Sequence, residues 1–274
     1  MARTWLITGS SRGLGRALVQ AVLESGDNVA ATARNPDSLQ PFVQKYGAKR
    51  VLAAALDVTN ADQVFEVVGL AHQTFGRIDI VVNNAGFAAT SSLEDMSVET
   101  FRRQVDANLL GTVWVTKAVI PILRKQGSGH IFQVSSVGDR LGTPGLSGYQ
   151  CAKWAVAGLT TVLQQEISGF GIKLTVLEPG AMKTDWAGSS MELGNISEPY
   201  QPTVGMFLSF REQFMQNAST PEAVSKAIIQ ISNVENPPLR LLLGPETPGY
   251  AKEALQKLGE SDAEWENFTK TLSL

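Results

Sequence analysis

The chain has 274 residues, of which 43% are hydrophobic and 18% are charged, a composition typical of a globular protein with a large core. Its net charge of −3 argues against nucleic acid or an anionic membrane as a partner, and its single cysteine, Cys151, excludes an internal disulfide and a multi-cysteine metal site. Because no run of 18 apolar residues and no leader-like segment is present, we expect a cytoplasmic protein with no membrane partner and no metal.

Apolar strands and amphipathic helices alternate along almost the whole chain. The strands are apolar throughout rather than alternating, which indicates burial on both faces of a parallel sheet. The sequence therefore predicts one α/β domain over residues 1–274, a doubly wound parallel sheet with helices on both faces. The expected strands are 4–8, 28–33, 50–56, 78–82, 129–135, 173–177 and 240–243, and the expected helices are 16–25, 36–46, 61–75, 98–124, 149–168 and one that starts at Thr220-Pro221-Glu222.

Three stretches depart from this alternation of strands and helices. The helix over 98–124 should be interrupted near Gly111 and Pro121. Residues 184–219 are too long for an ordinary connection, and their aromatic and methionine residues predict a substrate lid. Within the lid, Phe207, Phe210 and Phe214 follow the spacing of a short amphipathic helix. Residues 245–274 form an extension with two short helical pieces, at 251–258 and 263–271.

A glycine cluster lies between the first strand and the first helix. Gly9, Gly13 and Gly15 have the spacing G-x-x-x-G-x-G, which differs from the general G-x-G-x-x-G fingerprint. Glycines at this place let the backbone approach a pyrophosphate, and the free N–H groups of a helix start favour an anion. Glycine-rich turns are also common as purely structural features, but the strand–turn–helix context favours a dinucleotide site.

Charge at the end of the second strand predicts which dinucleotide binds. A protein that binds NAD has an acidic residue there, which accepts from the ribose 2′-hydroxyl. This chain instead has Ala33 followed by Arg34, with Arg12 in the glycine loop. Guanidinium groups bind a 2′-phosphate well, so NADP(H) is favoured, although Arg34 could also merely open a solvated loop. Asp57, after the third strand, is placed to accept from the adenine amino group or to cap the next helix, and Val58 to line the adenine pocket.

A tyrosine and a lysine stand four residues apart at the start of the helix over 149–168. This spacing puts Tyr149 and Lys153 on one helix face, and Ser136 ends the preceding strand region. Reduction of a carbonyl needs a proton donor, and a tyrosine pKa of ~10 would have to fall by ~3 units to match neutral pH, at ~4 kcal/mol. A lysine ammonium about 4 Å away supplies that much only at an effective dielectric of about 20, so the site must be partly dry. Between them, Cys151 is expected to be a buried apolar residue.

In order and spacing, these motifs resemble the short-chain dehydrogenase/reductase family, in its short single-domain branch, over residues 1–245. The resemblance implies strand order 3-2-1-4-5-6-7 and a catalytic tetrad. Tyr149 would be the acid/base, Ser136 rather than its neighbour Ser135 would orient the substrate, and Asn108 would hold a water that relays protons to Lys153. The matching residues are Gly9, Ser11, Arg12, Gly13, Leu14 and Gly15, Asp57 and Val58, Asn84, Ala85 and Gly86, Asn108, Ser136, Tyr149 and Lys153, and Pro179 and Gly180 followed by Thr184.

The resemblance also implies where each part of the cofactor would lie. Lys153 would hold the nicotinamide ribose, and the backbone after Pro179 with the Thr184 hydroxyl would bind the carboxamide. Asn84, Ala85 and Gly86 would pack beside the adenosine half. A homodimer through the helices over 98–124 and 149–168 and a homotetramer remain equally open. In tetrameric members one interface uses the last strand and the chain end, where this chain has its extension.

The function that we expect is NADP(H)-dependent reduction of a ketone or aldehyde. If the lid lines the substrate pocket, this substrate is expected to be bulky and apolar. The aromatic lid residues could equally serve only to pack the lid onto the core. Alternatives are a 3-oxoacyl thioester reductase and a non-catalytic NADP-binding sensor. A sugar-nucleotide epimerase or dehydratase is disfavoured by the glycine spacing and by the length of the chain.

Overall fold

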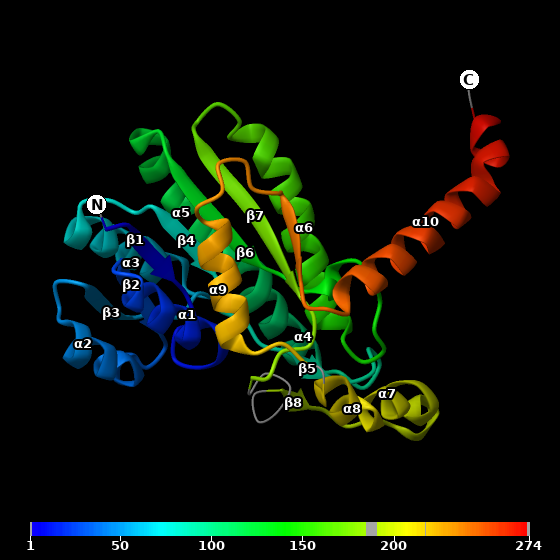
Figure 1. Cartoon of the computed structure of the whole chain (residues 1–274). Helices are drawn as coiled ribbons and strands as arrows, with labels where there is room; N and C mark the ends of the chain where they lie inside the picture. The colour runs from blue at the N-terminus through cyan, green and yellow to red at the C-terminus, as the bar shows by residue number, and fades with distance from the viewer. Residues whose placement is uncertain (1, 185–190, 217, 273–274) are drawn as a thin grey trace.

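The computed structural model describes residues 2–184, 191–216 and 218–272 and shows a seven-stranded parallel sheet. The order across the sheet is β3-β2-β1-β4-β6-β7-β9, which is 3-2-1-4-5-6-7 when the seven strands are counted along the chain, as predicted (Figure 1). The strands are β1 Thr4–Ile7, β2 Asn28–Ala33, β3 Val51–Ala55, β4 Ile80–Asn83, β6 Gly129–Val134, β7 Ile172–Pro179 and β9 Arg240–Leu243.

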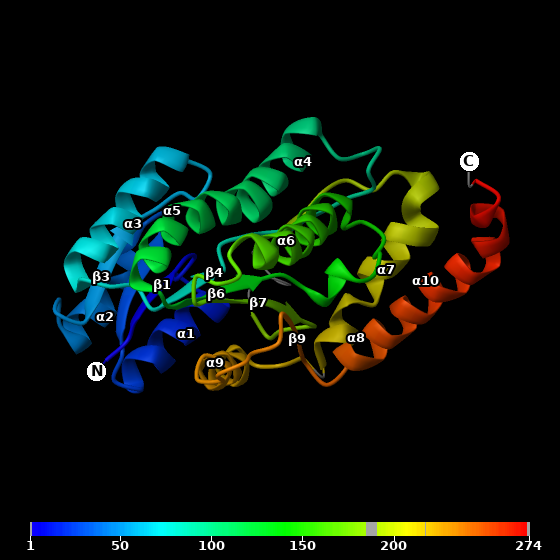
Figure 2. The same cartoon turned by 90° about the horizontal axis from the view of Figure 1, so that it is seen from above.

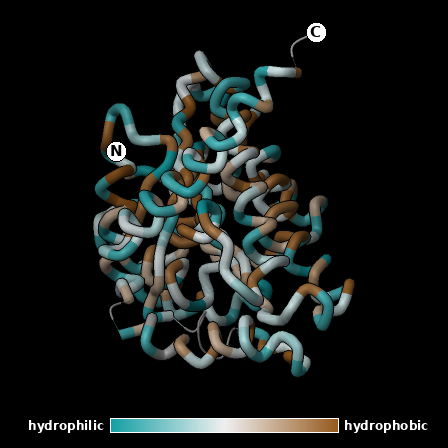
Figure 3. The backbone as a smooth tube through the Cα atoms, turned by 90° about the vertical axis from the view of Figure 1, so that its right-hand side faces the viewer, coloured by the Kyte–Doolittle hydropathy of each residue, from teal (hydrophilic) through white to brown (hydrophobic). Residues whose placement is uncertain are grey.

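Helices cover both faces of this sheet (Figure 2). On one face, α1 Gly13–Glu24, α2 Gln40–Tyr46 and α9 Pro221–Ile231 pack in a core with Trp5 and Ile7 of β1. On the other face, α3 Ala61–Phe75, α5 Gly111–Gln126 and α6 Ser147–Glu166 pack in a core with Leu6. Neighbouring residues of β1 thus enter opposite cores, which is why the strands are apolar at every position. Figure 3 shows the hydrophobic residues recurring through these central elements.

The helix starts follow capping rules that are visible in the sequence. Thr220 caps α9 by accepting a hydrogen bond from the Ala223 N–H, with Pro221 in the first turn, as predicted. Asn60 caps α3, so the alternative role for Asp57 as that cap is wrong. The segment expected as one helix over 36–46 is a 3₁₀ turn, Pro36–Leu39, followed by α2.

The long helix in the middle of the chain is interrupted at one of the two expected places. It consists of α4 Val98–Val105, a π-helical turn Asp106–Leu110, and α5, which continues through Pro121. The prediction of a break at Pro121 is wrong. The hydrogen bond that this proline cannot donate is outweighed by the packing of Val115, Val119 and Leu123 against the sheet.

By length and composition alone, the helical segment Val98–Gln126 would be able to cross a membrane. The criterion of an unbroken apolar run misses this segment, because polar residues interrupt it. Its most apolar window is 44% buried inside the domain, which is the environment of a core helix. This burial supports, as a proposal, the expected absence of a membrane partner.

The predicted lid forms a separate lobe beside the sheet (Figure 1). Its described part holds β8 Glu192–Leu193, a 3₁₀ turn Glu198–Tyr200, a π-helical turn Gln201–Gly205, α7 Met206–Ser209 and α8 Arg211–Gln216. The single amphipathic helix expected through the three phenylalanines is wrong, because the chain breaks at the half-exposed Phe210 between α7 and α8. The side chain of Phe214 and residue Trp186 lie outside what the structure describes.

The C-terminal extension is one helix, α10 Thr247–Lys270, and not the two pieces that were expected. Gly259 does not interrupt it, since one exposed glycine costs a helix only about 1 kcal/mol. Pairs of opposite charge four residues apart support the helix on both sides of the glycine, Lys257 with Glu253 and Lys270 with Glu266.

Candidate active site

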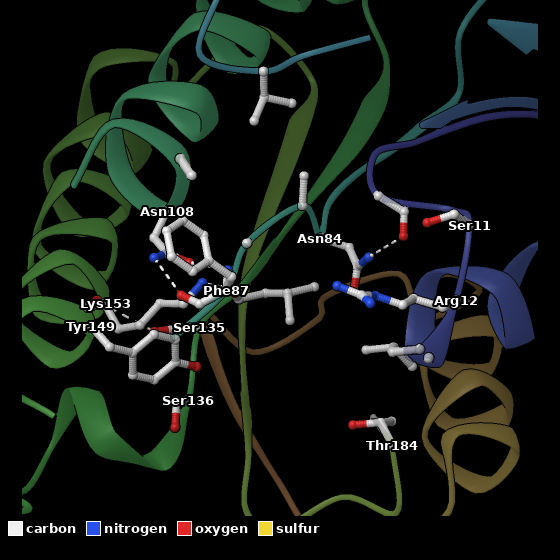
Figure 4. A pocket seen from close by; sticks show the side chains of 18 of the residues that line it. Ser11, Arg12, Asn84, Phe87, Asn108, Ser135, Ser136, Tyr149, Lys153 and Thr184 are labelled. Carbon is white, nitrogen blue, oxygen red and sulfur yellow. Dashed lines mark hydrogen bonds between the residues drawn. The ribbon is translucent and has the colours of Figure 1, made fainter. Parts of the chain in front are cut away.

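A pocket of about 750 Å³ opens at the carboxyl ends of the parallel strands. Figure 4 shows its two ends: Asn108, Ser136, Tyr149 and Lys153 gather at one, and Ser11 and Arg12 of the loop after β1 lie at the other. Carboxyl ends of strands beside a change in strand order are where ligands bind in open α/β sheets. All the predicted site residues except Gly15 line this pocket.

The glycine loop is shaped for close approach of the backbone. Gly9 has φ +69°, and a Cβ there would lie 2.8 Å from the Ala85 Cα. A Cβ on Gly15 would lie 2.3 Å from the Gly9 carbonyl oxygen, so Gly15 supports the loop from behind. The start of α1 has no side-chain cap and no acidic residue in its first turn, which suits an anion.

The end of β4 holds this loop in place. The Asn84 side chain donates to the carbonyls of Thr8 (2.9 Å) and Gly9 (3.1 Å). In return, the Thr8 hydroxyl oxygen accepts from the N–H groups of Asn84 and Ala85, both at 3.0 Å. Sequence reasoning did not single out Thr8, although a polar residue at the buried end of an apolar strand is a usable signal.

Two arginines and an aspartate lie at the glycine-loop end of the pocket. Arg12 and Arg34 are both exposed and line the pocket, and within the described residues neither forms an ion pair. Asp57 also lines the pocket, and its Oδ1 accepts from the N–H (3.0 Å) and the hydroxyl (2.8 Å) of Thr59. Two cations therefore face this end of the pocket, as the sequence predicted for a phosphate.

At the other end, the predicted catalytic side chains converge. Tyr149 and Lys153 are buried on one face of α6, and the Lys153 ammonium lies 5.5 Å from the centre of the Tyr149 ring. The Ser136 side chain hydrogen-bonds to that of Tyr149. Lys153 Nζ donates to the main-chain carbonyl of Val134 at the end of β6 (2.8 Å). The fold thus brings a hydroxyl, a phenol and an ammonium into one buried cluster.

The two neighbouring serines have different surroundings. Ser136 lies at the start of a 3₁₀ turn, where its Oγ accepts from the Gly138 N–H (3.0 Å) beside Tyr149. The fully buried Ser135 instead donates to Asp139 Oδ2 (2.6 Å) and reaches the Lys153 carbonyl (3.3 Å). This geometry favours Ser136 as the serine that faces a substrate.

Burial dominates the electrostatics of the phenol. It raises the pKa of Tyr149 above its ordinary value, against a smaller lowering by the hydrogen bond from Ser136. Burial also lowers the pKa of Lys153 to about 8. The expected lowering of the Tyr149 pKa by Lys153 is therefore absent, because the ammonium is directed to Val134 and desolvation of the phenol is the larger effect.

Asn108 lies in the π-helical turn and is fully buried. Its Nδ2 donates to the carbonyls of Phe87 (2.9 Å) and Gln104 (2.8 Å), and its Oδ1 accepts from the Phe87 N–H (3.2 Å). The side chain thereby ties the helix to the chain that follows Gly86. The role expected for Asn108, holding a water near Lys153, stays a prediction.

A buried charge cluster under the catalytic end was missed by the sequence reasoning. The side chains of Asp139 and Glu178 are fully buried, and Arg240 bridges them, with Asp139 Oδ1 at 2.5 Å from its guanidinium. Arg140 pairs with Glu178 at 2.7 Å. Burial and the nearby Glu178 raise the pKa of Asp139 to about 6. A glutamate within an apolar strand was the available signal, because a buried acid requires a partner.

The predicted lid packs against the Tyr149 end of the site. Met191 and Phe207 pack on a small apolar cluster of Ala88, Leu146 and Tyr149. Thr184, at the lid's start, lies beside Gly13, with its methyl 3.5 Å from a Cβ built there. Lys183 and Ser219 pair through their backbones (2.8 Å), so the two ends of the lid segment lie side by side.

Two other residues, Cys151 and His130, correct or complete the sequence predictions. Cys151 is exposed, so its expected burial is wrong, because its helix face points away from the sheet. His130 is buried and its Nε2 lies 3.0 Å from the Thr175 hydroxyl, with burial lowering its pKa to about 3. His130 is therefore a structural residue of the core.

Comparisons with known proteins agree with this geometry. The family model described as short chain dehydrogenase matches residues 3–193. Oxidoreductase BOA17 of Botryotinia fuckeliana is 53% identical over 98% of both chains, and a 3-ketodihydrosphingosine reductase of Bacteroides thetaiotaomicron is 33% identical over 88% of this chain and 87% of its own.

Solved structures agree as well. A short-chain dehydrogenase from Streptomyces avermitilis is 31% identical, with a TM-score of 0.92 over 100% of this chain and 99% of its own. An alcohol dehydrogenase from Thermococcus sibiricus, solved with 5-hydroxy-NADP, is 27% identical, with a TM-score of 0.73 over 89% and 97% of the two chains.

Proposed function

The chain belongs to the short-chain dehydrogenase family of oxidoreductases, and from this premise we propose that it is an NADP(H)-dependent carbonyl reductase. In the reverse direction it would act as an alcohol dehydrogenase. The observation that carries the proposal is the convergence of Ser136, Tyr149 and Lys153 at one end of the pocket. The glycine loop and two exposed arginines, Arg12 in that loop and Arg34 after β2, lie at the other end.

The pocket fits a dinucleotide phosphate. The glycine loop at the pocket, the uncapped start of α1, and the guanidinium groups of Arg12 and Arg34 suit a pyrophosphate and a 2′-phosphate. When bound, NADPH would supply a hydride from nicotinamide C4. Ala33, Ser11, Leu14, Asp57, Val58 and the segment Asn84–Gly86 would contact the adenosine and phosphate half, and Pro179, Gly180 and Thr184 the nicotinamide half.

The residues of the chain would supply the proton and hold the substrate oxygen. With its pKa raised by burial, Tyr149 keeps its proton at neutral pH and can donate it to the carbonyl oxygen as the carbon accepts the hydride. Ser136, already hydrogen-bonded to Tyr149, would donate to the same oxygen. The Lys153 ammonium, beside the ring, would stabilise the phenolate that remains.

The substrate that we propose is a bulky, apolar ketone or aldehyde. Tyr149 is in an apolar cluster with Ala88 and Leu146, on which Met191 and Phe207 of the lid pack. The relative named as a 3-ketodihydrosphingosine reductase, a protein that by its name acts on a ketone, supports this choice. A 3-oxoacyl thioester remains the second candidate substrate.

The test is oxidation of NADPH and of NADH by the purified protein, followed at 340 nm. The panel includes aliphatic and aromatic ketones, aldehydes and 3-oxoacyl thioesters of increasing chain length. We expect turnover with NADPH that rises with the size of the apolar group. Tight NADPH binding without turnover of any compound would instead favour a cofactor-sensing protein, and a clear preference for thioesters would favour the second candidate.

A further inference from the structure

The C-terminal helix α10 leaves the domain and extends into solvent (Figures 1 and 2). Its root is fixed, because Thr247 and Ala251 are buried and Glu246, just before it, accepts from the Ala181 N–H (2.9 Å). From residue 255 to residue 272, every residue is exposed. More than four turns of helix therefore have no cover from their own domain.

The exposed part of α10 carries four large apolar side chains on one face, and Leu272 continues their spacing in the turn after the helix. These five residues are here called the α10 stripe. Their spacings of three, seven, three and four residues follow the helical period, and each side chain is 58–72% exposed. Trp265 and Phe268 contact each other edge to face, with ring centres 5.9 Å apart. The stripe consists of Leu255, Leu258, Trp265, Phe268 and Leu272.

Such a helix does not hold its shape alone in water. An isolated helix of this length is only marginally stable, and contiguous exposed apolar surface of this kind usually marks an interface. The charge around the stripe excludes a lipid surface, because three lysines are outnumbered by five acidic residues over 247–270. Helices that lie on membranes are instead rich in lysine and arginine on the polar face.

We propose that the α10 stripe pairs with the α10 stripe of a second copy of this chain, in an antiparallel pair around a twofold axis. A crossing between Leu258 and Ser261 would bring Lys257 beside Glu264 of the second copy, and the same ion pair would form twice. The crossing also sets Trp265 against the small Ala254 of the second copy. The stripe is thus complementary to itself in both shape and charge.

The area is sufficient for such a pair. Each stripe side chain has about 100 Å² to bury, so two stripes remove roughly 1,000 Å² of apolar surface from water, which is the lower bound for a stable biological interface. The flanking charged side chains add to this area. The proposal is independent of the reaction that the protein catalyses.

The first test measures mass by sedimentation velocity for three proteins. These are the wild type, the stripe variant Leu258→Glu/Trp265→Glu, and the control Gln256→Glu/Asn267→Glu, which adds the same charge to the opposite face of the helix. We expect the stripe variant to have half the mass of the wild type and the control to keep the full mass. Circular dichroism and NADPH turnover would show that all three domains are folded.

The second test is site-specific cross-linking, in a Cys151→Ser background that removes the one native, exposed thiol. Ser261→Cys is expected to give a covalent dimer with a short bis-maleimide, whereas Asn267→Cys on the opposite face is not. In hydrogen exchange, amides 255–268 should be protected in the wild type and exchange at least tenfold faster in the stripe variant. Equal masses for the wild type and the stripe variant, or equal cross-linking at the two positions, would overturn the proposal.

Discussion

Tyr149 and Lys153 are both buried, and burial disfavours the charged form of each. It raises the pKa of Tyr149 and lowers the pKa of Lys153. A tyrosine that stays protonated at neutral pH can donate in the reductive direction without further tuning. The sequence argument, which treated the ammonium as the main influence, underestimated the desolvation of the phenol. The proposed chemistry therefore needs the Ser136 hydrogen bond and the lysine charge most at the moment when the phenolate forms.

Tyr149→Phe removes the proposed proton donor and leaves the glycine loop untouched. We expect kcat for ketone reduction to fall about a thousandfold, since general acid catalysis contributes 10²–10⁴. The Kd for NADPH, measured by fluorescence titration, should change less than threefold. Tyr46→Phe is the matched control, because Tyr46 does not line the pocket and its hydroxyl accepts from the Gln20 side chain. Activity above one tenth of the wild-type value would contradict the assignment of Tyr149.

Ala33→Asp combined with Arg34→Ala exchanges the charge at the end of β2. We expect the ratio of kcat/KM for NADPH over NADH to fall at least tenfold, because an acid repels the 2′-phosphate and accepts from a free 2′-hydroxyl. Arg77→Ala, an exposed arginine paired with Asp79 and absent from the pocket lining, is the control. A ratio that does not move would show that charge at this position does not select the cofactor.

The elements place these residues by simple geometry. The i, i+4 spacing of Tyr149 and Lys153 works because α6 is regular from Ser147 to Glu166. Asn108, in contrast, depends on an irregular element, the π-helical turn that joins α4 to α5. Such turns frequently occur at functional sites. The sequence predicted an interruption near Gly111 but could not specify its type.

Asp95 is one of the groups that attach the lid to the domain. Asp95 accepts from the N–H (2.9 Å) and hydroxyl (3.0 Å) of Ser197 in the lid, and from the Ser92 hydroxyl (2.7 Å). Asp95→Ala should raise KM for a bulky ketone about fivefold with kcat nearly unchanged, because the charge-assisted hydrogen bonds that hold Ser197 of the lid are lost. Limited proteolysis should also cut the lid faster.

The control for this experiment is Glu99→Ala, an exposed acid on α4 with no lid contact among the described residues. The hydrogen bonds from Ser197 and Ser92 hold the pKa of Asp95 below its usual value. Because a lowered pKa keeps the carboxylate charged above pH 4, wild-type KM should be flat from neutral pH down to about 4 and rise only below it. An unchanged KM in Asp95→Ala would show that the lid does not depend on this anchor.

At the scale of the whole molecule, Asp139, Glu178 and Arg240 connect segments that are far apart in the chain. The loop after β6, the strand β7 and the last strand β9 meet through these charges under the catalytic cluster. Burying two carboxylates together is costly, and the cost depends on pH. This cluster therefore makes the stability of the fold depend on pH, and that dependence can be measured.

Asp139 has a pKa raised from 3.8 to about 6, so the folded state binds the proton more tightly than the unfolded state and stability falls as pH rises from 4 to 6. Asp139→Asn removes this group. The difference in unfolding free energy, variant minus wild type, should increase by about 2 kcal/mol between pH 4 and pH 6.5 and then level off. Urea unfolding at four pH values measures it, with Asp37→Asn as an exposed control. A pH-independent difference would contradict the raised pKa.

The sequence by itself determined the strands, the glycine loop and the spacing of Tyr149 and Lys153, and its resemblance to a family implied the order of the strands. Strand burial, helix caps and i, i+4 neighbours are local properties that the residues encode directly, and the family's motifs supplied the rest. It also predicted 18 of the pocket-lining residues by position, from Gly9 to Thr184.

Only the tertiary structure decided how those groups are surrounded. The direction of the Tyr149 pKa shift, the exposure of Cys151 and the buried partners of Glu178 depend on what packs nearby from distant parts of the chain. The same holds for α10, whose amphipathic pattern is local but whose exposure is a fact about the whole fold. Desolvation and long-range pairing are properties of three-dimensional neighbours, which no pattern along the chain records.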